Sequence, residues 1–244
     1  MDLLVVLRGL TLGARLLLVA AAWRAIAHVR ERAAGPERLV WITLAGQYAV
    51  LAMTTAAVEV DWLLHNLLPA ARRAAIYHPT YLLNATVTAA TPWLVAAWLA
   101  SLAIARRLAQ VMVGGIVAMA VLALVTGAGQ DWATLMAWTQ VLSFVEIGGY
   151  LTFGGLILLG HARRVNPYVM GLLAAAGLFA VVVPIQAEFF ELVGQDHAGK
   201  IWHLNQALQL LKVSVELLIV LAYMNSMVPR QRASHEPQRI GLRH

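Results

Sequence analysis

The feature that most constrains this sequence is a series of long apolar segments that contain few or no charges. Crossing the hydrocarbon core of a bilayer, roughly 30 Å thick, takes about 20 helical residues, and several segments reach that length. Of the 244 residues, 61% are hydrophobic and only 12% are charged, with a mean hydropathy of +0.72. We therefore predict an all-α fold, a polytopic transmembrane bundle of about six or seven membrane helices. The chain contains no cysteine, which excludes disulfides, iron–sulfur clusters and thiolate-ligated zinc.

Seven apolar segments can be distinguished, and the first is the hardest to interpret. They cover residues 3–29, 39–58, 79–105, 108–125, 132–160, 165–187 and 201–227. In the first, Arg8 and Arg15 share one helical face while Arg24 lies opposite. This segment therefore either spans the membrane or lies as an amphipathic helix in the interface.

Prolines and arginines set the expected ends and bends of the later segments. We expect a short loop at residues 69–77 before the third segment, which Pro92 should bend and which should stop at Arg106 and Arg107. Pro184 is expected to interrupt the sixth segment. A cleavable signal sequence is not expected, because arginines interrupt the first apolar run.

The distribution of cations predicts the orientation. One set of connections carries Arg24, Arg30, Arg32, Arg38, Arg106, Arg107, Arg163, Arg164, Arg230, Arg232, Arg239 and Arg243, and the alternate set carries Arg72, Arg73 and Lys200. By the positive-inside rule the first set is cytoplasmic, with the N-terminus outside if seven helices span. We predict one transmembrane domain over residues 1–228 and a basic, disordered cytoplasmic tail over residues 229–244. The basic charge then has a topological origin and indicates contact with anionic lipid rather than with nucleic acid.

A possible metal site lies where the second segment ends. Asp61, His65 and His78 form the pattern Asp-x3-His-x12-His. If the helix continues through this stretch, Asp61 and His65 share one face, and His78 returns from the start of the next helix. One carboxylate and two neutral imidazoles suit copper, zinc, iron or nickel. The alternative is that these side chains are polar groups at the membrane surface.

The order of these features resembles the C-type subunit of the copper membrane monooxygenases, which oxidise methane, ammonia or short hydrocarbons. The resemblance rests on Asp61, His65 and His78 and on a Gln-Asp-Trp stretch at residues 130–132, and it covers about residues 39–160. It implies that the three residues are catalytic copper ligands that take part in O2 activation. Both imidazoles would be neutral donors, and Asp61 would supply negative charge. The expected activity is hydroxylation of a small substrate such as a short hydrocarbon or ammonia.

The family's second copper site is expected to be lost or replaced. The corresponding positions here are Gln130, Thr134 and, by spacing, Gly148. The resemblance also implies A-type and B-type partner subunits in a trimer of heterotrimers, a quinol as electron donor, and a bacterial inner membrane. Two alternatives remain: a non-catalytic structural or assembly subunit, and a transporter or proton-conducting protein.

Further ionisable residues lie in the later segments. Lys212 and Glu216 are four residues apart, which indicates either mutual neutralisation or a proton path. Glu146 is then either uncharged or paired with Lys212. A second cluster contains Glu188, Glu191, Asp196, His197 and His203. It could hold a metal, although acidic and histidine residues in such a loop are more often solvated.

Overall fold

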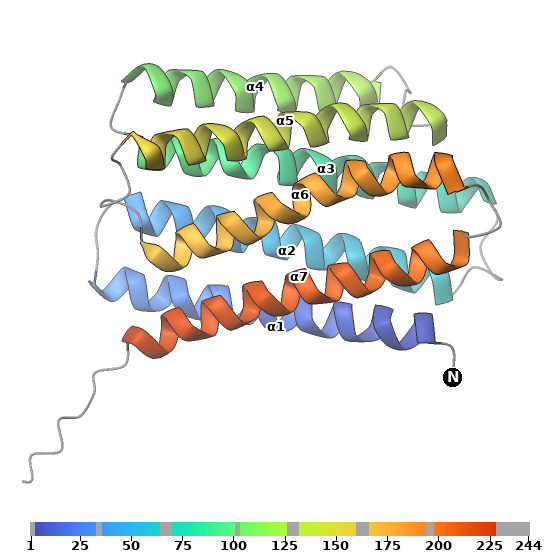
Figure 1. Ribbon diagram of the computed structural model, residues 1–244, viewed down its shortest axis with the longest axis horizontal. Coiled ribbons are helices and arrows are strands. Elements are labelled where there is room, and N and C mark those ends of the chain that lie inside the picture. Colours follow the sequence, from blue (N-terminus) through green and yellow to red (C-terminus); the bar gives the residue numbers. More distant parts are fainter. Residues whose placement is uncertain are drawn as a thin grey trace, which may run out of the picture.

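The structure is a computed structural model that describes residues 3–32, 36–63, 70–100, 103–125, 132–159, 166–193 and 198–227. These residues form seven α-helices (Figure 1). The helices are α1 (Leu3–Arg32), α2 (Pro36–Leu63), α3 (Ala70–Leu99), α4 (Ala103–Val125), α5 (Trp132–Leu158), α6 (Pro167–Val193) and α7 (Ala198–Met227). Six of them are long and apolar enough to cross a membrane. The predicted all-α, multi-pass membrane bundle is confirmed.

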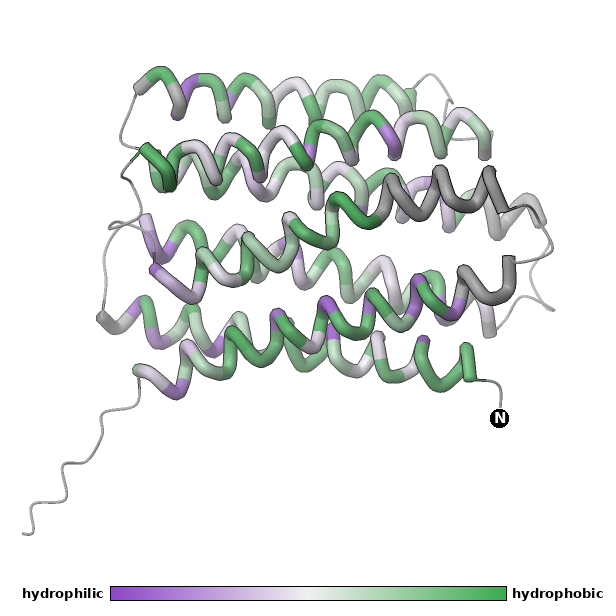
Figure 2. The backbone as a smooth tube through the Cα atoms, in the orientation of Figure 1, coloured by the Kyte–Doolittle hydropathy of each residue, from purple (hydrophilic) through white to green (hydrophobic). Residues whose placement is uncertain are grey.

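Six helices close into a ring, and the seventh lies outside it. Around the ring, α1 packs against α2, α2 against α3, α3 against α5, α5 against α6, α6 against α7, and α7 against α1. Helix α4 packs mainly against α3, at the edge of the bundle seen in Figure 1. Its outer face exposes large apolar side chains, such as Val111 and Val121, and Figure 2 shows that hydrophobic residues predominate along this helix. Such a surface is expected to face lipid.

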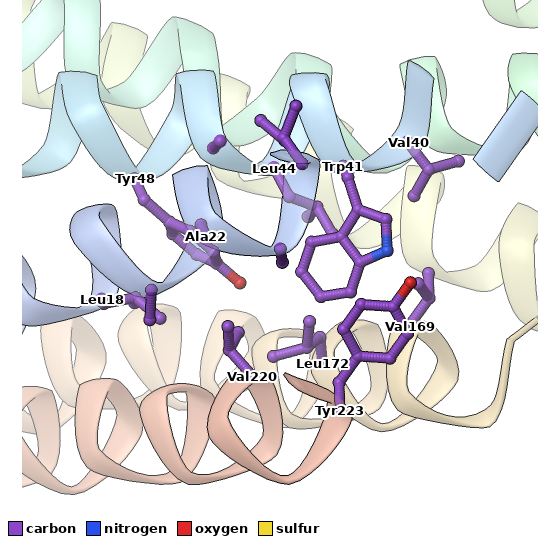
Figure 3. Close-up of a cluster of buried hydrophobic side chains, with 14 of the residues drawn as sticks. Leu18, Ala22, Val40, Trp41, Leu44, Tyr48, Val169, Leu172, Val220 and Tyr223 are labelled. Atoms are coloured by element: carbon purple, nitrogen blue, oxygen red, sulfur yellow. The ribbon is translucent and has the colours of Figure 1, made fainter. Parts of the chain in front are cut away.

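Helix α1 is part of the bundle. It is a candidate span of 28 residues and lies along both α2 and α7. Its residues Leu18, Ala22 and Val29 belong to the main hydrophobic core (Figure 3 labels the first two). This packing along two helices favours the spanning alternative over an amphipathic helix in the interface.

The half of the bundle away from the α2–α3 connection is built around Trp41 and Tyr223, and we call it the Trp41 end. Both side chains are fully buried, and their rings stack with centroids 4.6 Å apart (Figure 3). The Tyr223 hydroxyl donates a hydrogen bond to Glu37 Oε1 at 2.9 Å, and Asn166 Nδ2 donates to the same oxygen at 2.9 Å. Asn166 Oδ1 accepts a bond from the Tyr168 backbone N–H at 2.9 Å, which caps α6 just before Pro167.

One connection that was expected to be a loop is part of a helix. The loop expected at 69–77 is largely helical, because α3 begins at Ala70 and contains Pro79 and Pro92. The Thr80 hydroxyl donates to the carbonyls of Ile76 and Tyr77 at 2.9 Å each. Such side-chain bonds satisfy backbone groups near a proline and let a membrane helix continue through it.

The boundary between the third and fourth segments and the course of the sixth also differ from expectation. Helix α3 ends at Leu99 and α4 covers Ala103–Val125, so Arg106 and Arg107 lie inside α4. Arginine is a good helix former, which is why a pair of charges does not end a helix. Helix α6 continues through Pro184 to Val193.

The contact between α3 and α5 depends on a glycine. A Cβ on Gly149 would lie 2.7 Å from Pro92 Cγ and 2.9 Å from two atoms of the Trp93 indole. Trp93 Nε1 donates a hydrogen bond to the carbonyl of Val145 at 3.0 Å. Glycine at this position therefore permits the close approach of the two helices.

Candidate functional site

The predicted metal ligands are only partly described. Asp61 lies in the last turn of α2, and His78, which is partly buried, lies in α3. His65 and the side chain of Asp61 lie outside the described residues. Among the side chains that the structure does describe, no group of three or more His, Asp or Glu could hold a metal ion. The site made of Asp61, His65 and His78 stays a prediction.

A partly open cavity of about 470 Å³ lies in the same half of the bundle as Asp61 and His78. Four helices line it with Leu4, Arg8, Thr11 and Arg15 of α1, Thr54, Thr55, Val58, Glu59 and Trp62 of α2, Tyr77, Thr80, Tyr81 and Asn84 of α3, and Gln206 and Gln209 of α7. Trp62 follows Asp61 in the chain and Tyr77 precedes His78. The cavity therefore lies in the half of the bundle where α2 ends and α3 begins, which we call the α2–α3 end.

An ion pair forms one side of the cavity. Arg8 Nε lies 3.0 Å from Glu59 Oε1 and 3.0 Å from Oε2, and both side chains are largely shielded from solvent. The Arg8 guanidinium also lies over the Trp62 ring, 4.7 Å from its centroid, in a cation–π geometry. Arg8 is therefore neutralised and fixed by two residues of α2.

Arg15 has different surroundings. Its Nη1 donates to the Leu51 carbonyl at 3.3 Å and to the Thr55 hydroxyl, and its Nη2 donates to Gln209 Oε1 at 3.2 Å. All three acceptors are neutral. Its Nε is buried and has no hydrogen-bond partner among the described residues. Among the described residues, no carboxylate oxygen lies within 4.0 Å of an Arg15 nitrogen, the limit for an ion pair.

The remaining cavity wall is made of hydroxyl, amide and aromatic groups. The Thr11 and Thr54 hydroxyls donate to carbonyls of their own helices, at 2.8 Å and 3.1 Å, so their oxygens can still accept bonds. Tyr77 and Tyr81 stack with ring centroids 6.1 Å apart. The wall therefore offers donors, acceptors, one ion pair and one further cation, which is chemistry that can bind and orient a polar group.

A second polar group lies deeper in the bundle. Glu146 of α5 and Glu216 of α7 are buried, with 8% and 4% of their surfaces exposed, so both lie inside the bundle as predicted. Lys212 acts electrostatically on both carboxylates, and Tyr150 forms a hydrogen bond with Glu146. Among the described residues, no ion pair within 4.0 Å joins Lys212 to either carboxylate, so its charge acts on them through space. Neutralisation within α7 and a proton path both stay predictions.

The other predicted positions give less information. The side chains of Glu188 and Glu191 lie outside the described residues, as do Gln130, Asp196 and His197, whereas His203 is partly buried in α7. Thr134 lies in the first turn of α5. Gly148 stands where the resembling family has a ligand of its second copper site. A Cβ on Gly148 would lie 3.6 Å from the Trp93 indole, so this indole occupies the space beside it.

The residues around Arg15 were not predicted as a site. The available signal was the pair Arg8 and Arg15, seven residues apart in an otherwise apolar segment, because ionisable residues inside a membrane helix are costly and usually functional. Gln206 and Gln209 carry no such signal, since uncharged amides are common at helix ends. Comparisons with protein-family models, with curated proteins and with solved structures found no match for this chain.

Proposed function

We propose that this multi-pass membrane protein binds a small amphipathic molecule in the cavity at the α2–α3 end. The observation that carries the proposal is a partly open cavity of about 470 Å³ among membrane-spanning helices, with charged, amide and hydroxyl groups set in a mostly apolar wall. Ligand sites in proteins typically have volumes of about 300–1,000 Å³ and place a few polar groups in an apolar surround.

The position of the cavity supports binding from the membrane. Its lining comes from the first part of α1, the last part of α2, and the early parts of α3 and α7, so it lies toward one membrane surface. Orienting groups come from four helices, which can fix a ligand more tightly than one helix could. The sequence-predicted orientation puts this end toward the outer surface.

Filling the cavity tests the proposal. The double substitution Thr11→Leu/Thr54→Leu adds apolar volume and removes only bonds within single helices. Small molecules extracted from the purified wild type should include one lipophilic compound at close to one per chain, and the double variant should lack it. Thr139→Leu, which removes a similar bond on α5 away from the cavity, is the matched control and should retain the compound. Equal amounts in all three proteins, or no such compound in the wild type, would contradict the proposal.

A second candidate function is that of a copper-dependent monooxygenase subunit. The observation in its favour is that Asp61, in the last turn of α2, and His78, near the start of α3, lie at the same end of the bundle as the cavity. With His65, these residues would hold the copper at the α2–α3 end, and the metal would supply O2 activation for hydroxylation of a small hydrocarbon or ammonia. The two imidazoles would act as nitrogen donors and Asp61 would supply negative charge. A-type and B-type subunits and a quinol donor would complete such a complex.

Metal analysis tests the second candidate. Copper per chain should fall from close to one in the wild type to near zero in His65→Ala and in His78→Ala. His203→Ala, a histidine of α7 that does not line the cavity, should leave the copper unchanged. Copper that is absent from the wild type, or that is unaffected by both substitutions, would favour the structural-subunit alternative. An activity that depends on Glu146, Lys212 and Glu216 but not on the histidines would favour transport or proton conduction.

A further inference from the structure

The charges on the cavity wall do not cancel. Among the described lining residues, the ionisable groups that carry charge at neutral pH are Arg8, Arg15 and Glu59. Arg8 and Glu59 form an ion pair with both carboxylate oxygens 3.0 Å from Arg8 Nε. Arg15 is left with neutral acceptors alone. This part of the wall therefore carries one positive charge without a directly bound counter-ion.

The hydrogen bonds of Arg15 are also incomplete. A guanidinium has five N–H donors in a fixed, planar arrangement. Three bonds go to a carbonyl, a hydroxyl and an amide oxygen, while the buried Nε donor has no partner among the described residues. An uncompensated charge away from water is strongly unfavourable, and a planar set of free donors suits a carboxylate or phosphate group.

Two protein carboxylates act on Arg15, but neither contacts it. They belong to Glu59 and Glu216. The Glu59 carboxylate is held by Arg8, and Glu216 is also under the influence of Lys212, one turn away on α7. The charge of Arg15 is therefore balanced only through space, and Arg15 lines the cavity without a directly bound carboxylate among the described residues.

We propose that the ligand of this cavity is an amphiphile with a single anionic head group, which binds the Arg15 guanidinium. This inference rests on the proposed binding function. Thr55 and Gln209, which already bond Arg15, lie beside the head group, and the apolar tail lies along the surrounding membrane helices. A tail is required because Arg15 lies well inside a 28-residue membrane span, where a fully hydrophilic ion does not partition. A carboxylate and a phosphate monoester share the required chemistry.

Native mass spectrometry of the full chain in a neutral detergent tests the inference. The probes have one tail and four head groups: laurate, dodecyl phosphate, dodecanol and dodecyltrimethylammonium. Laurate or dodecyl phosphate should bind one per chain with a Kd at least about tenfold below that of dodecanol, because hydrogen bonds to charged groups exceed neutral ones by about that factor. The comparison of laurate with dodecyl phosphate identifies the head group. Acetate and inorganic phosphate, which lack a tail, should not compete.

Substitutions locate the site. Arg15→Gln should bring the Kd of the anionic probe to within about twofold of that of dodecanol, and Arg15→Lys should retain part of the preference. Arg24→Gln removes an exposed arginine from the same helix and should change neither Kd.

Equal wild-type affinity for laurate, dodecyl phosphate and dodecanol would overturn the anionic head group while leaving the binding function intact, and this measurement needs no variant. Tight binding of the anionic probe that is unchanged in Arg15→Gln would also overturn the assignment of the anionic head group to Arg15. If no probe binds and the cavity-filling variant also loses no ligand, the proposed function fails as well.

Discussion

The two ends of the bundle treat their buried polar groups in opposite ways. At the Trp41 end, Glu37 receives hydrogen bonds from Tyr223 and Asn166, and Asn166 also caps α6. At the α2–α3 end, Arg15 has only neutral acceptors and a free Nε donor. Buried polar groups are normally paired. The difference indicates that the first end is built for stability and the second for binding.

The Trp41 end is not free of unpaired donors. Trp41 Nε1 is buried and has no hydrogen-bond partner among the described residues. An indole N–H is neutral, however, and leaving it unpaired costs far less than leaving a charge uncompensated. The stacking of Trp41 on Tyr223 also contributes packing energy that Arg15 does not have.

The largest effect is expected when the packing of the Trp41 end is removed. Trp41→Ala should lower the free energy of unfolding by about 3–5 kcal/mol, because the ring is fully buried and stacked on Tyr223. Trp23→Ala, at an exposed tryptophan, should have a much smaller effect. Unfolding in mixed micelles with increasing SDS measures both. Similar losses in the two variants would remove the distinction between a packed core and a lipid-facing surface.

An intermediate effect is expected at the cavity. Glu59→Gln removes the carboxylate that neutralises Arg8 and should tighten binding of the anionic probe roughly tenfold, or about 1.4 kcal/mol. Glu37→Gln removes a carboxylate at the Trp41 end and should leave the Kd unchanged. Native mass spectrometry measures both values. A Kd for Glu59→Gln that is equal to or higher than that of the wild type would show that Glu59 does not repel the ligand's charge.

The smallest effect is expected at the cap of α6. Asn166→Ala should lower the free energy of unfolding by about 1 kcal/mol, because it removes the bonds to Glu37 and to the Tyr168 N–H. Asn166→Ser keeps a capping oxygen but is too short to reach Glu37, so its loss should be smaller than that of Ala. Equal losses for Ser and Ala would assign the whole effect to the contact with Glu37.

Much of the fold could be predicted from the sequence. Each of the seven apolar segments corresponds to one helix, because bilayer thickness sets a length that can be counted directly. The segment ends were less predictable. Pro79 lies inside α3, and Arg106 lies inside α4, since neither residue type ends a helix whose backbone bonds must be satisfied internally.

The cavity could not be predicted in the same way. In a soluble helix, apolar periodicity identifies the buried face, but here both the core and the lipid-facing surfaces are apolar. The sequence therefore does not reveal that α1 packs against α7. Without that contact, Arg15 cannot be placed beside Gln209. The three metal-ligand positions rest on their spacing and on a family resemblance, and the described residues do not test them.

The contact between α1 and α7 sets an order of events during synthesis. Helix α1 enters the membrane first, with Arg8 and Arg15 in it, whereas α7 is made last. Membrane chains are synthesised from the N-terminus at about 5–20 residues per second, so α1 waits some seconds for the helix that supplies Gln206 and Gln209. Glu59 of α2 reaches Arg8 early, but Arg15 obtains its α7 partner only after that helix has been made. Tyr223 of α7 completes the Trp41 end in the same way, so both ends of the bundle wait for this helix. A chain truncated before α7 carries its arginines into the membrane without a binding site.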